Sequence, residues 1–264
     1  MTPAEIAALA DKVATARRER RVMDFMPGAT DAMSEDEAYH TQFAVHDRLT
    51  ANGADRIAGW KVALSLPALY LPAGLSQPAF AGIYGSGVKQ SGLTVAKGAI
   101  FKAGVECEIV ARIAKDAAPG AKPYDAESIK PFIASLHCGM EIVENRHADL
   151  SKVSGKGRIV DEVLQYACVV GPEIANWRGI DLGAVDGSCA LDGNKVAGGP
   201  GTNVMGGPLI ALAWLANRLN QFGKQLKAGD VILTGSTHPP YMLPGAGTVT
   251  ATWQGLGETK ATFG

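Results

Sequence analysis

The sequence predicts an α+β fold, in which a small helical N-terminal region (residues 1–56) precedes a mainly β, rolled domain (residues 57–264). Before Gly53, apolar residues recur at helical spacing in two segments. After Gly53, short apolar runs alternate with breaks that contain glycine or proline, which is typical of strands joined by turns. The 32 glycines of the chain also suit a sheet with many tight turns.

Two helices are expected in the N-terminal region. The first covers about residues 3–21, where Ile6, Leu9 and Val13 follow helical spacing. The second begins at Ser34, because Ser34-Glu35-Asp36-Glu37 has the pattern of a capping box, and it continues to about residue 52. Gly53 then takes the position after the helix, where glycine is preferred.

Most of the later apolar runs have the length of a strand. They cover about residues 57–64, 99–114, 139–143, 166–170, 188–191, 231–233, 248–253 and 259–263. Two further helices are expected among them, at about residues 126–138 and 208–223. Pro208 suits the first position of the later helix, and Gly223 suits its end.

Composition and charge exclude several classes of protein. Hydrophobic residues make up 47% of the chain and charged residues 19%, so a substantial core can form. The net charge of −1 gives no electrostatic reason to expect a nucleic-acid or anionic-membrane partner. The chain opens with a charged, helical segment rather than a secretory signal, and no apolar run reaches the roughly 18 residues that span a bilayer. A cytoplasmic location is therefore expected.

The four cysteines are expected to be free, buried thiols. Cys107, Cys138, Cys168 and Cys189 are spread along the chain without a C-x-x-C pair. An even number of cysteines does not by itself imply disulfides in a chain of this size.

The most informative segment is Gly104-Val-Glu-Cys-Glu-Ile-Val110. Side chains alternate along a strand, so Glu106 and Glu108 would share one face and Cys107 would lie on the other. Two neighbouring carboxylates in an apolar element resist ionisation unless a cation lies between them. Alternating acids also occur on solvent-facing strand edges, so the pair by itself leaves both interpretations open.

Glu141 is a third candidate ligand, because it lies in an otherwise apolar, strand-like run directly after the expected helix at 126–138. Three carboxylates suit a hard cation such as Mg²⁺ or Mn²⁺. They would also leave coordination positions for substrate and water, as a catalytic site requires.

Lys61 is the only charged residue in the apolar run Ala58-Gly-Trp-Lys-Val-Ala-Leu64. Most lysines on strands face solvent, which is the simpler interpretation. The functional interpretation is a general acid or base, or a cation that orients a substrate carboxylate.

The order of these motifs resembles the 2-keto-4-pentenoate hydratase branch of the fumarylacetoacetate hydrolase superfamily, a branch that also contains 4-oxalocrotonate decarboxylase. G-x-K-x-x-L-S at residues 59–65 precedes Glu-x-Glu, and E-I-V-E-x-R follows at residues 141–146. The likeness continues through residues 208–219, the segment L-K-A-G-D-V-I-L-T-G-S at 226–236, and Q-G-L-G at 254–257. It therefore covers nearly the whole chain.

The resemblance implies a rolled mixed β-sheet of the fumarylacetoacetate hydrolase C-terminal type and a Mg²⁺ or Mn²⁺ centre. It also implies a small 2-oxo (2-hydroxydienoic) acid of aromatic-compound catabolism as substrate, and a homo-oligomer. By position, three acids match the family's metal ligands (Glu106, Glu108 and Glu141). Lys61 matches its catalytic lysine, and Ser65 and Ser236 match hydroxyls near the substrate.

The chain departs from the family pattern at several positions. Hydratases typically carry Asp in Q-P-D-(F/Y)-G, where this chain has Ala79, and decarboxylases of the branch can lack an acid there. Glu144 stands for the usual Asp, Gly207-Pro208 for His-Pro, and Asp161-Glu162 for Asp-Asn. A shifted substrate specificity is therefore expected.

Four functions stay open at this point. A hydratase comes first and a decarboxylase second, since the same metal ligands serve both reactions. A C–C hydrolase comes third and a non-catalytic keto-acid-binding paralogue fourth. A hydrolase needs a base to activate water, and His238, which follows Ser236, is the histidine expected near the substrate. His46 is expected on a solvated helix face, and His147 at a cap or on the surface.

Two glycine-rich segments are interpreted as loops. Ser154-Gly-Lys-Gly-Arg158 resembles a phosphate-binding loop but lacks the full G-x-x-x-x-G-K-(S/T) pattern, so a mobile basic loop is expected. Gly198-Gly-Pro-Gly201 is expected to form a turn.

Overall fold

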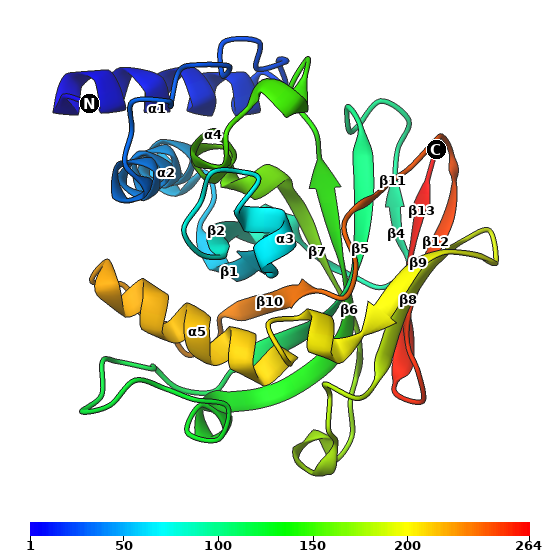
Figure 1. Cartoon of the computed structure of the whole chain (residues 1–264). Coiled ribbons are helices and arrows are strands. Elements are labelled where there is room, and N and C mark those ends of the chain that lie inside the picture. The colour runs from blue at the N-terminus through cyan, green and yellow to red at the C-terminus, as the bar shows by residue number, and fades with distance from the viewer.

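A computed structural model describes the whole chain, Met1–Gly264, as two β-sheets with helices around them (Figure 1). The strands are β1 (Ile57–Ala63), β2 (Ala79–Tyr84), β3 (Val88–Gln90), β4 (Leu93–Val95), β5 (Ala103–Ile113), β6 (Ile133–Glu144), β7 (Gln165–Glu173), β8 (Asp186–Leu191), β9 (Asn194–Pro200), β10 (Val231–Ser236), β11 (Tyr241–Met242), β12 (Gly247–Trp253) and β13 (Gly257–Phe263). The larger sheet has the order β2-β1-β10-β5-β6-β7-β3, with β11 paired to β5. The smaller sheet has the order β4-β13-β12-β8-β9.

The helices are α1 (Pro3–Arg18), α2 (Glu35–Thr50), α3 (Pro67–Tyr70), α4 (Gly155–Val160) and α5 (Pro208–Gln221). The capping box predicted at the start of α2 is present, since Ser34 accepts from the Glu37 backbone and Glu37 accepts from the Ser34 backbone. Figure 1 shows α1, α2 and α4 together at one end of the molecule and α5 beside β10. The helical expectations at both N-terminal segments and at α5 are therefore confirmed, with ends that differ by a few residues.

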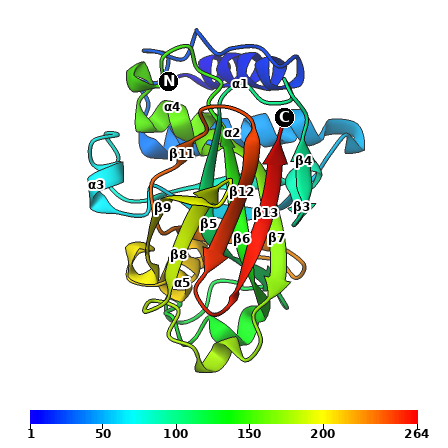
Figure 2. The ribbon, with the colours of Figure 1, turned by 90° about the vertical axis from the view of Figure 1, so that its right-hand side faces the viewer.

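The smaller sheet packs against one face of the larger sheet, in front of β5, β6 and β7 (Figure 2). Cys107 of β5 points into this interface, where its Sγ lies 3.6 Å from the backbone oxygen of Thr252. Trp253 donates from its indole nitrogen to the backbone oxygen of Glu108 at 2.9 Å. One face of β5 is thus closed by the second sheet, and only its other face is left for a site.

The helix expected at residues 126–138 is wrong. Residues 133–144 form β6, which lies between β5 and β7 and pairs with both. Pro131 prevents a helix from running through this segment, because it lacks an N–H and its ring clashes with the preceding turn. Only a 3₁₀ turn, Lys130–Phe132, precedes the strand. Ladder hydrogen bonds on both sides then override the local helix propensity.

Other departures concern short elements that the sequence pattern did not reveal. The segment interpreted as a mobile basic loop, residues 154–158, is instead the N-cap and first four residues of α4, and the expected turn at 198–201 is mostly β9. β2 contains the Ala79 segment, and all six of its residues are buried. All four cysteines are free and buried, as predicted. None of the helices combines the length and the apolar character that crossing a membrane requires.

A buried acid, Asp161, joins the N-terminal helices to the larger sheet. Its carboxylate lies 2.8 Å from Nη1 of Arg17 on α1, and 3.4 Å from Nη1 of Arg146, which follows β6. His147 contacts the other oxygen at 3.1 Å. Burial by itself would raise the pKa of Asp161, but Arg146, His147 and Arg17 hold it well below its usual value. The ionised carboxylate is therefore part of the folded state.

Replacing Asp161 by Asn should destabilise the protein by about 3–5 kcal/mol at neutral pH, because Arg17 and Arg146 would lose their buried partner. A lowered folded-state pKa contributes stability above the usual value of 3.8, and this stability is lost as the pH falls below it. Urea unfolding between about pH 3 and 7 should show this acid limb in the wild type and a weaker one in Asp161→Asn. The exposed control Asp149→Asn should keep the acid limb of the wild type. An unchanged acid limb in Asp161→Asn would contradict this assignment.

Candidate metal centre and substrate cavity

The free face of β5 and the adjoining strand β6 bring the three predicted acids together. Glu106 is paired across the ladder with Glu141, and Glu108 lies two residues further along β5 on the same face. One carboxylate oxygen from each residue can be chosen so that all three lie within 4.8 Å of one another. Glu108 and Glu141 are each 1% exposed, so water does little to screen the repulsion between their charges. The three predicted ligands therefore form one cluster that could hold a metal ion.

The raised pKa values of the three acids show that burying their carboxylates together is unfavourable without a cation. Burial raises the pKa of Glu106 to about 8, and the nearby charge of Glu141 adds to this rise. Burial and the other two acids raise the pKa of Glu108 well above its usual value. Burial also raises the pKa of Glu141, although Lys61 opposes the rise. A divalent cation would remove this penalty, and carboxylate oxygens are ligands that hard cations prefer, so the residues fit such an ion.

The backbone of β10 orients Glu108. The N–H of Gly235 donates to Oε2 of Glu108 at 2.7 Å. Gly235 has a φ of 109°, a conformation that side chains disfavour, so glycine is required where the strand presents this N–H. The carboxylate is thereby fixed by the fold rather than by a metal alone.

Lys61 lies beside the acids and is 1% exposed, so the solvent-facing interpretation is wrong. Its Nζ donates to Oε1 of Glu141 at 2.6 Å and to the backbone oxygen of Val163 at 2.8 Å. Gly59, two residues earlier on β1, allows close packing on β10, since a Cβ there would lie 1.8 Å from the Val231 oxygen. The G-x-K pattern thus combines close strand packing with a buried ammonium group.

The turn that contains Val163 has an unfavourable backbone conformation. Glu162, Val163 and Leu164 have φ values of 56°, 43° and 66°, which lie in the left-handed region. Such conformations cost free energy, most of all for a β-branched residue. The Glu162 carboxylate holds the turn by accepting from the Gly82 N–H at 3.1 Å and from the Tyr84 hydroxyl at 3.2 Å. His46 of α2 lies 2.8 Å away from the same carboxylate.

These contacts correct two expectations about histidines. His46 was expected on a solvated helix face, but it is buried and paired with Glu162. His147 was expected at a cap or on the surface, but it is buried and paired with Asp161. Neither lines the cavity beside the acids.

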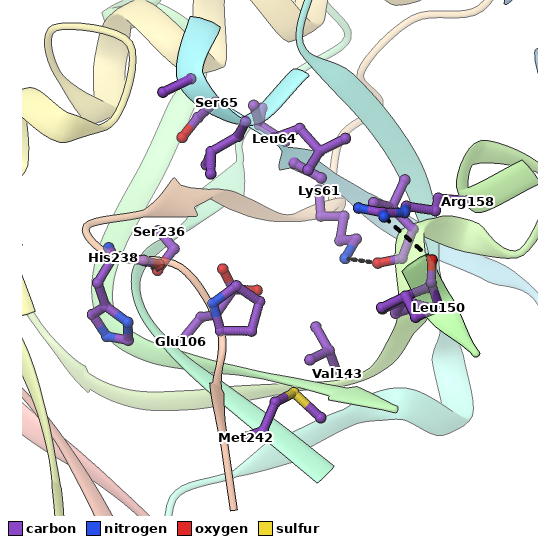
Figure 3. A pocket seen from close by; sticks show the side chains of 17 residues that line it. Lys61, Leu64, Ser65, Glu106, Val143, Leu150, Arg158, Ser236, His238 and Met242 are labelled. Atoms are coloured by element: carbon purple, nitrogen blue, oxygen red, sulfur yellow. Dashed lines mark hydrogen bonds between the residues drawn. The ribbon is translucent and has the colours of Figure 1, made fainter. Parts of the chain in front are cut away.

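A cavity of ≈ 350 Å³ lies over the carboxylates, and most of its lining is apolar (Figure 3). Lys61 and Glu106 reach it from β1 and β5, and Glu106 is partly exposed there. Ser65 and Ser236 also line the cavity, so the structure brings both predicted hydroxyls to the predicted place. Ser236 donates from Oγ to the backbone oxygen of His238 at 2.6 Å, which fixes the hydroxyl at the wall.

His238 lines the cavity as predicted, but its ring is held by the backbone on both sides. Nε2 lies 3.3 Å from the Cys107 N–H, and Nδ1 lies 2.8 Å from the Pro239 oxygen. The ring therefore accepts at Nε2 and donates at Nδ1, which is the neutral tautomer. Burial lowers the pKa of His238 and favours the same form. No carboxylate pairs with the ring, so the His–carboxylate base that a hydrolase would use is missing from His238.

Arg158 is the charged residue of the cavity lining that sequence reasoning missed. Ser154 caps α4 by accepting from the Gly157 N–H at 3.3 Å, and the resulting turn directs Arg158 to the cavity wall. The available signal was Ser154 itself, because serine is preferred at the N-cap of a helix. The glycines that follow it favoured the interpretation as a loop.

Comparison with known proteins agrees with this architecture. Residues 83–263 match the family described as fumarylacetoacetate (FAA) hydrolase C-terminal. The chain is 30% identical over 257 residues to a 2-keto-4-pentenoate hydratase of Burkholderia vietnamiensis, covering 97% of this chain and 95% of that protein. It is 24% identical over 260 residues to a 4-oxalocrotonate decarboxylase of Pseudomonas putida, covering 98% and 97%.

The fold also matches a solved structure over the whole chain. The 4-oxalocrotonate decarboxylase from Pseudomonas putida G7, complexed with magnesium and adipate, gives a TM-score of 0.91 at 22% identity. The match covers 100% of this chain and 98% of that chain. It confirms the expected α+β fold with a rolled mixed sheet.

Binding of Mg²⁺ should change how stability depends on pH. A folded-state pKa above the usual 4.5 stabilises the metal-free protein at low pH, and this contribution is lost as the pH rises towards about 8. In EDTA, the Tm should therefore fall over this window. Mg²⁺ at a hundredfold excess over its Kd should restore about 2.7 kcal/mol.

Glu106→Gln should flatten the metal-free decline and remove the Mg²⁺-dependent rise in Tm. Glu258→Gln, which removes an exposed acid on β13, is the matched control and should keep both effects. A Mg²⁺-dependent rise that persists in Glu106→Gln would contradict the ligand assignment.

Proposed function

Because the chain belongs to the fumarylacetoacetate hydrolase family, we propose that it is a divalent-metal-dependent lyase acting on a small 2-oxo (2-hydroxydienoic) acid. The specific activity we propose is that of a 2-keto-4-pentenoate hydratase-like enzyme of aromatic-compound catabolism. The observation that carries the proposal is the cluster of Glu106, Glu108 and Glu141 beside a cavity, with Lys61 paired to one of the three acids.

We propose that the three acids hold Mg²⁺ (or Mn²⁺). When bound, the ion would supply a Lewis acid that polarises the 2-oxo group and orients the substrate carboxylate. The protein contributes a fixed set of oxygens: Glu106 reaches the cavity, while Glu108 and Glu141 are buried behind it. This arrangement keeps one side of the centre open to the substrate.

Lys61 is the proposed catalytic residue, because its ammonium group lines the cavity and donates a hydrogen bond to the acid cluster. The contacts with Glu141 and Val163 keep Nζ in one place while it holds or moves a proton. Ser65, Ser236 and His238 are the proposed substrate-binding residues. Because both nitrogens of His238 are occupied, we assign its ring to shaping the wall, while its backbone oxygen positions the Ser236 hydroxyl.

A 4-oxalocrotonate decarboxylase-like activity is the second candidate, and Ala79 favours it. Hydratases of the branch typically carry an acid at this position, whereas Ala79 is fully buried on β2 opposite Ala63. No carboxylate is present there to handle water or a proton. The same metal ligands and Lys61 would serve decarboxylation. The homo-oligomeric state and the cytoplasmic location stay predictions.

Steady-state turnover should separate these functions. The substrates are 2-hydroxypenta-2,4-dienoate and 4-oxalocrotonate, each with Mg²⁺ and with EDTA, for the wild type and Glu106→Ala. Loss of the dienoate signal with formation of a 4-hydroxy-2-oxo acid indicates a hydratase, and CO₂ release from oxalocrotonate indicates a decarboxylase. If neither substrate is turned over in a metal-dependent way and Glu106→Ala equals the wild type, a hydrolase or a keto-acid-binding protein remains.

Lys61→Met should lower kcat by about 10²–10⁴, the range that one general acid or base contributes. Mg²⁺-dependent binding of the 2-oxo acid should remain, because the three carboxylates are intact. Lys89→Met, which changes an exposed lysine on β3, is the control and should keep wild-type kcat. A kcat within a few-fold of the wild type for Lys61→Met would remove Lys61 from the proton-transfer role.

A further inference from the structure

Arg158 has a positive charge in the cavity that no protein group neutralises. Its Nε donates to the Val153 oxygen at 3.3 Å and its Nη2 to the Leu150 oxygen at 3.4 Å. Both acceptors are backbone carbonyls, and no carboxylate forms an ion pair with the guanidinium. Burial alone lowers the pKa of Arg158, with no neighbouring acid to raise it. Nη1 has no acceptor in the protein and is available to a ligand.

A divalent ion at the acid cluster would balance the other protein charges of the site. A divalent ion and Lys61 together match the three carboxylates of Glu106, Glu108 and Glu141. Arg158 lines the same cavity, but in the view of Figure 3 it lies beyond Lys61 as seen from Glu106. A ligand held by its 2-oxo acid group at the acid cluster would place that carboxylate on the far side of Lys61 from Arg158, so the guanidinium would have no carboxylate in direct contact.

The wall between these charges suits a short carbon chain. Val62, Leu64, Val143 and Leu164 are among the apolar residues that line the cavity with Arg158. Arg158 is oriented by two carbonyls, so its planar group is partly fixed before a ligand arrives. A preoriented guanidinium in a partly buried site is a strong receptor for a carboxylate.

We propose that Arg158 binds a second carboxylate of the substrate, so that the cavity selects a dicarboxylic 2-oxo acid over a monocarboxylic one. This inference rests on the proposed function, because it assumes that the 2-oxo acid end lies at the metal centre. Of the two candidate activities it favours the decarboxylase-like one, because 4-oxalocrotonate has two carboxylates whereas 2-hydroxypenta-2,4-dienoate has one. Arg158 is then a specificity-determining residue, which recognises the negative charge at the far end of the substrate.

Two unreactive acids of equal length test the proposal. 2-Oxoadipate and 2-oxohexanoate differ only in a terminal carboxylate in place of a methyl group. Isothermal titration calorimetry with Mg²⁺ should show the wild type binding 2-oxoadipate roughly tenfold or more tightly, as a charge-assisted hydrogen bond predicts. Arg158→Gln should lose that preference while its affinity for 2-oxohexanoate stays within about twofold, and Arg158→Lys should keep part of it.

Lys152→Gln is the matched control, since it removes an exposed cation of the same segment that does not line the cavity. It should keep the wild-type preference. Equal affinities of the wild type for the two acids, both dependent on Mg²⁺, would overturn the role of Arg158 and leave the proposed function intact. This comparison needs no variant, so it holds even if Arg158→Gln fails to fold. Absence of Mg²⁺-dependent binding of either acid would overturn the proposed function and this inference together.

Discussion

The mutual repulsion of three buried carboxylates is the constraint on which the rest of the structure depends. Glu106 and Glu141 face each other across the β5–β6 ladder, and Glu108 adds a third charge on the same face. Such a cluster favours protonation unless positive charge is brought close to it. The protein supplies one ammonium group, from Lys61, and one backbone N–H, from Gly235. The remaining deficit of positive charge is a property of the fold, and in the proposed function a divalent cation would supply it.

Lys61 can neutralise Glu141 only if its own position is held, and that requires parts of the chain far from the centre. Its second acceptor is the Val163 oxygen, which a left-handed turn presents. Backbone strain of this kind persists only where surrounding contacts determine it. Glu162 supplies such contacts through His46 of α2 and Tyr84 of β2, while Asp161 is held by Arg17 of α1. The N-terminal helices therefore contribute to the site without lining it.

Alternation along a strand was enough to predict that the acids lie together. Because Glu106 and Glu108 are two residues apart in an apolar run, any strand places them together, and the strand-like context of Glu141 extended the set. Lys61 was predicted as a site residue because it is the only charge in an apolar strand. Its pairing with Glu141 depends on tertiary contacts, which the pattern does not contain. A local sequence pattern does not predict structure where contacts between distant parts of the chain determine it.

β6 shows where prediction from a local pattern fails. Residues 133–138 have no local signal strong enough to outweigh a helical pattern, and only pairing with β5 and β7 makes them a strand. Pro131 was the one local sign against a helix, since it cannot occupy a helix interior without loss of a hydrogen bond. His46 and His147 likewise lie on segments whose polarity predicted exposure, and each is buried because a distant acid pairs with it.

In the proposed function, the charged groups of the cavity have two separate roles, proton transfer and recognition of the substrate. Lys61 is committed to Glu141, and His238 is neutral because the backbone occupies both of its nitrogens. Arg158 is consequently the cation of the lining whose charge is free to act on a ligand. It belongs to α4, a short helix between β6 and β7 and outside the central sheet. A change in that helix can alter which acids bind without moving β5, β6 or the carboxylates that they carry.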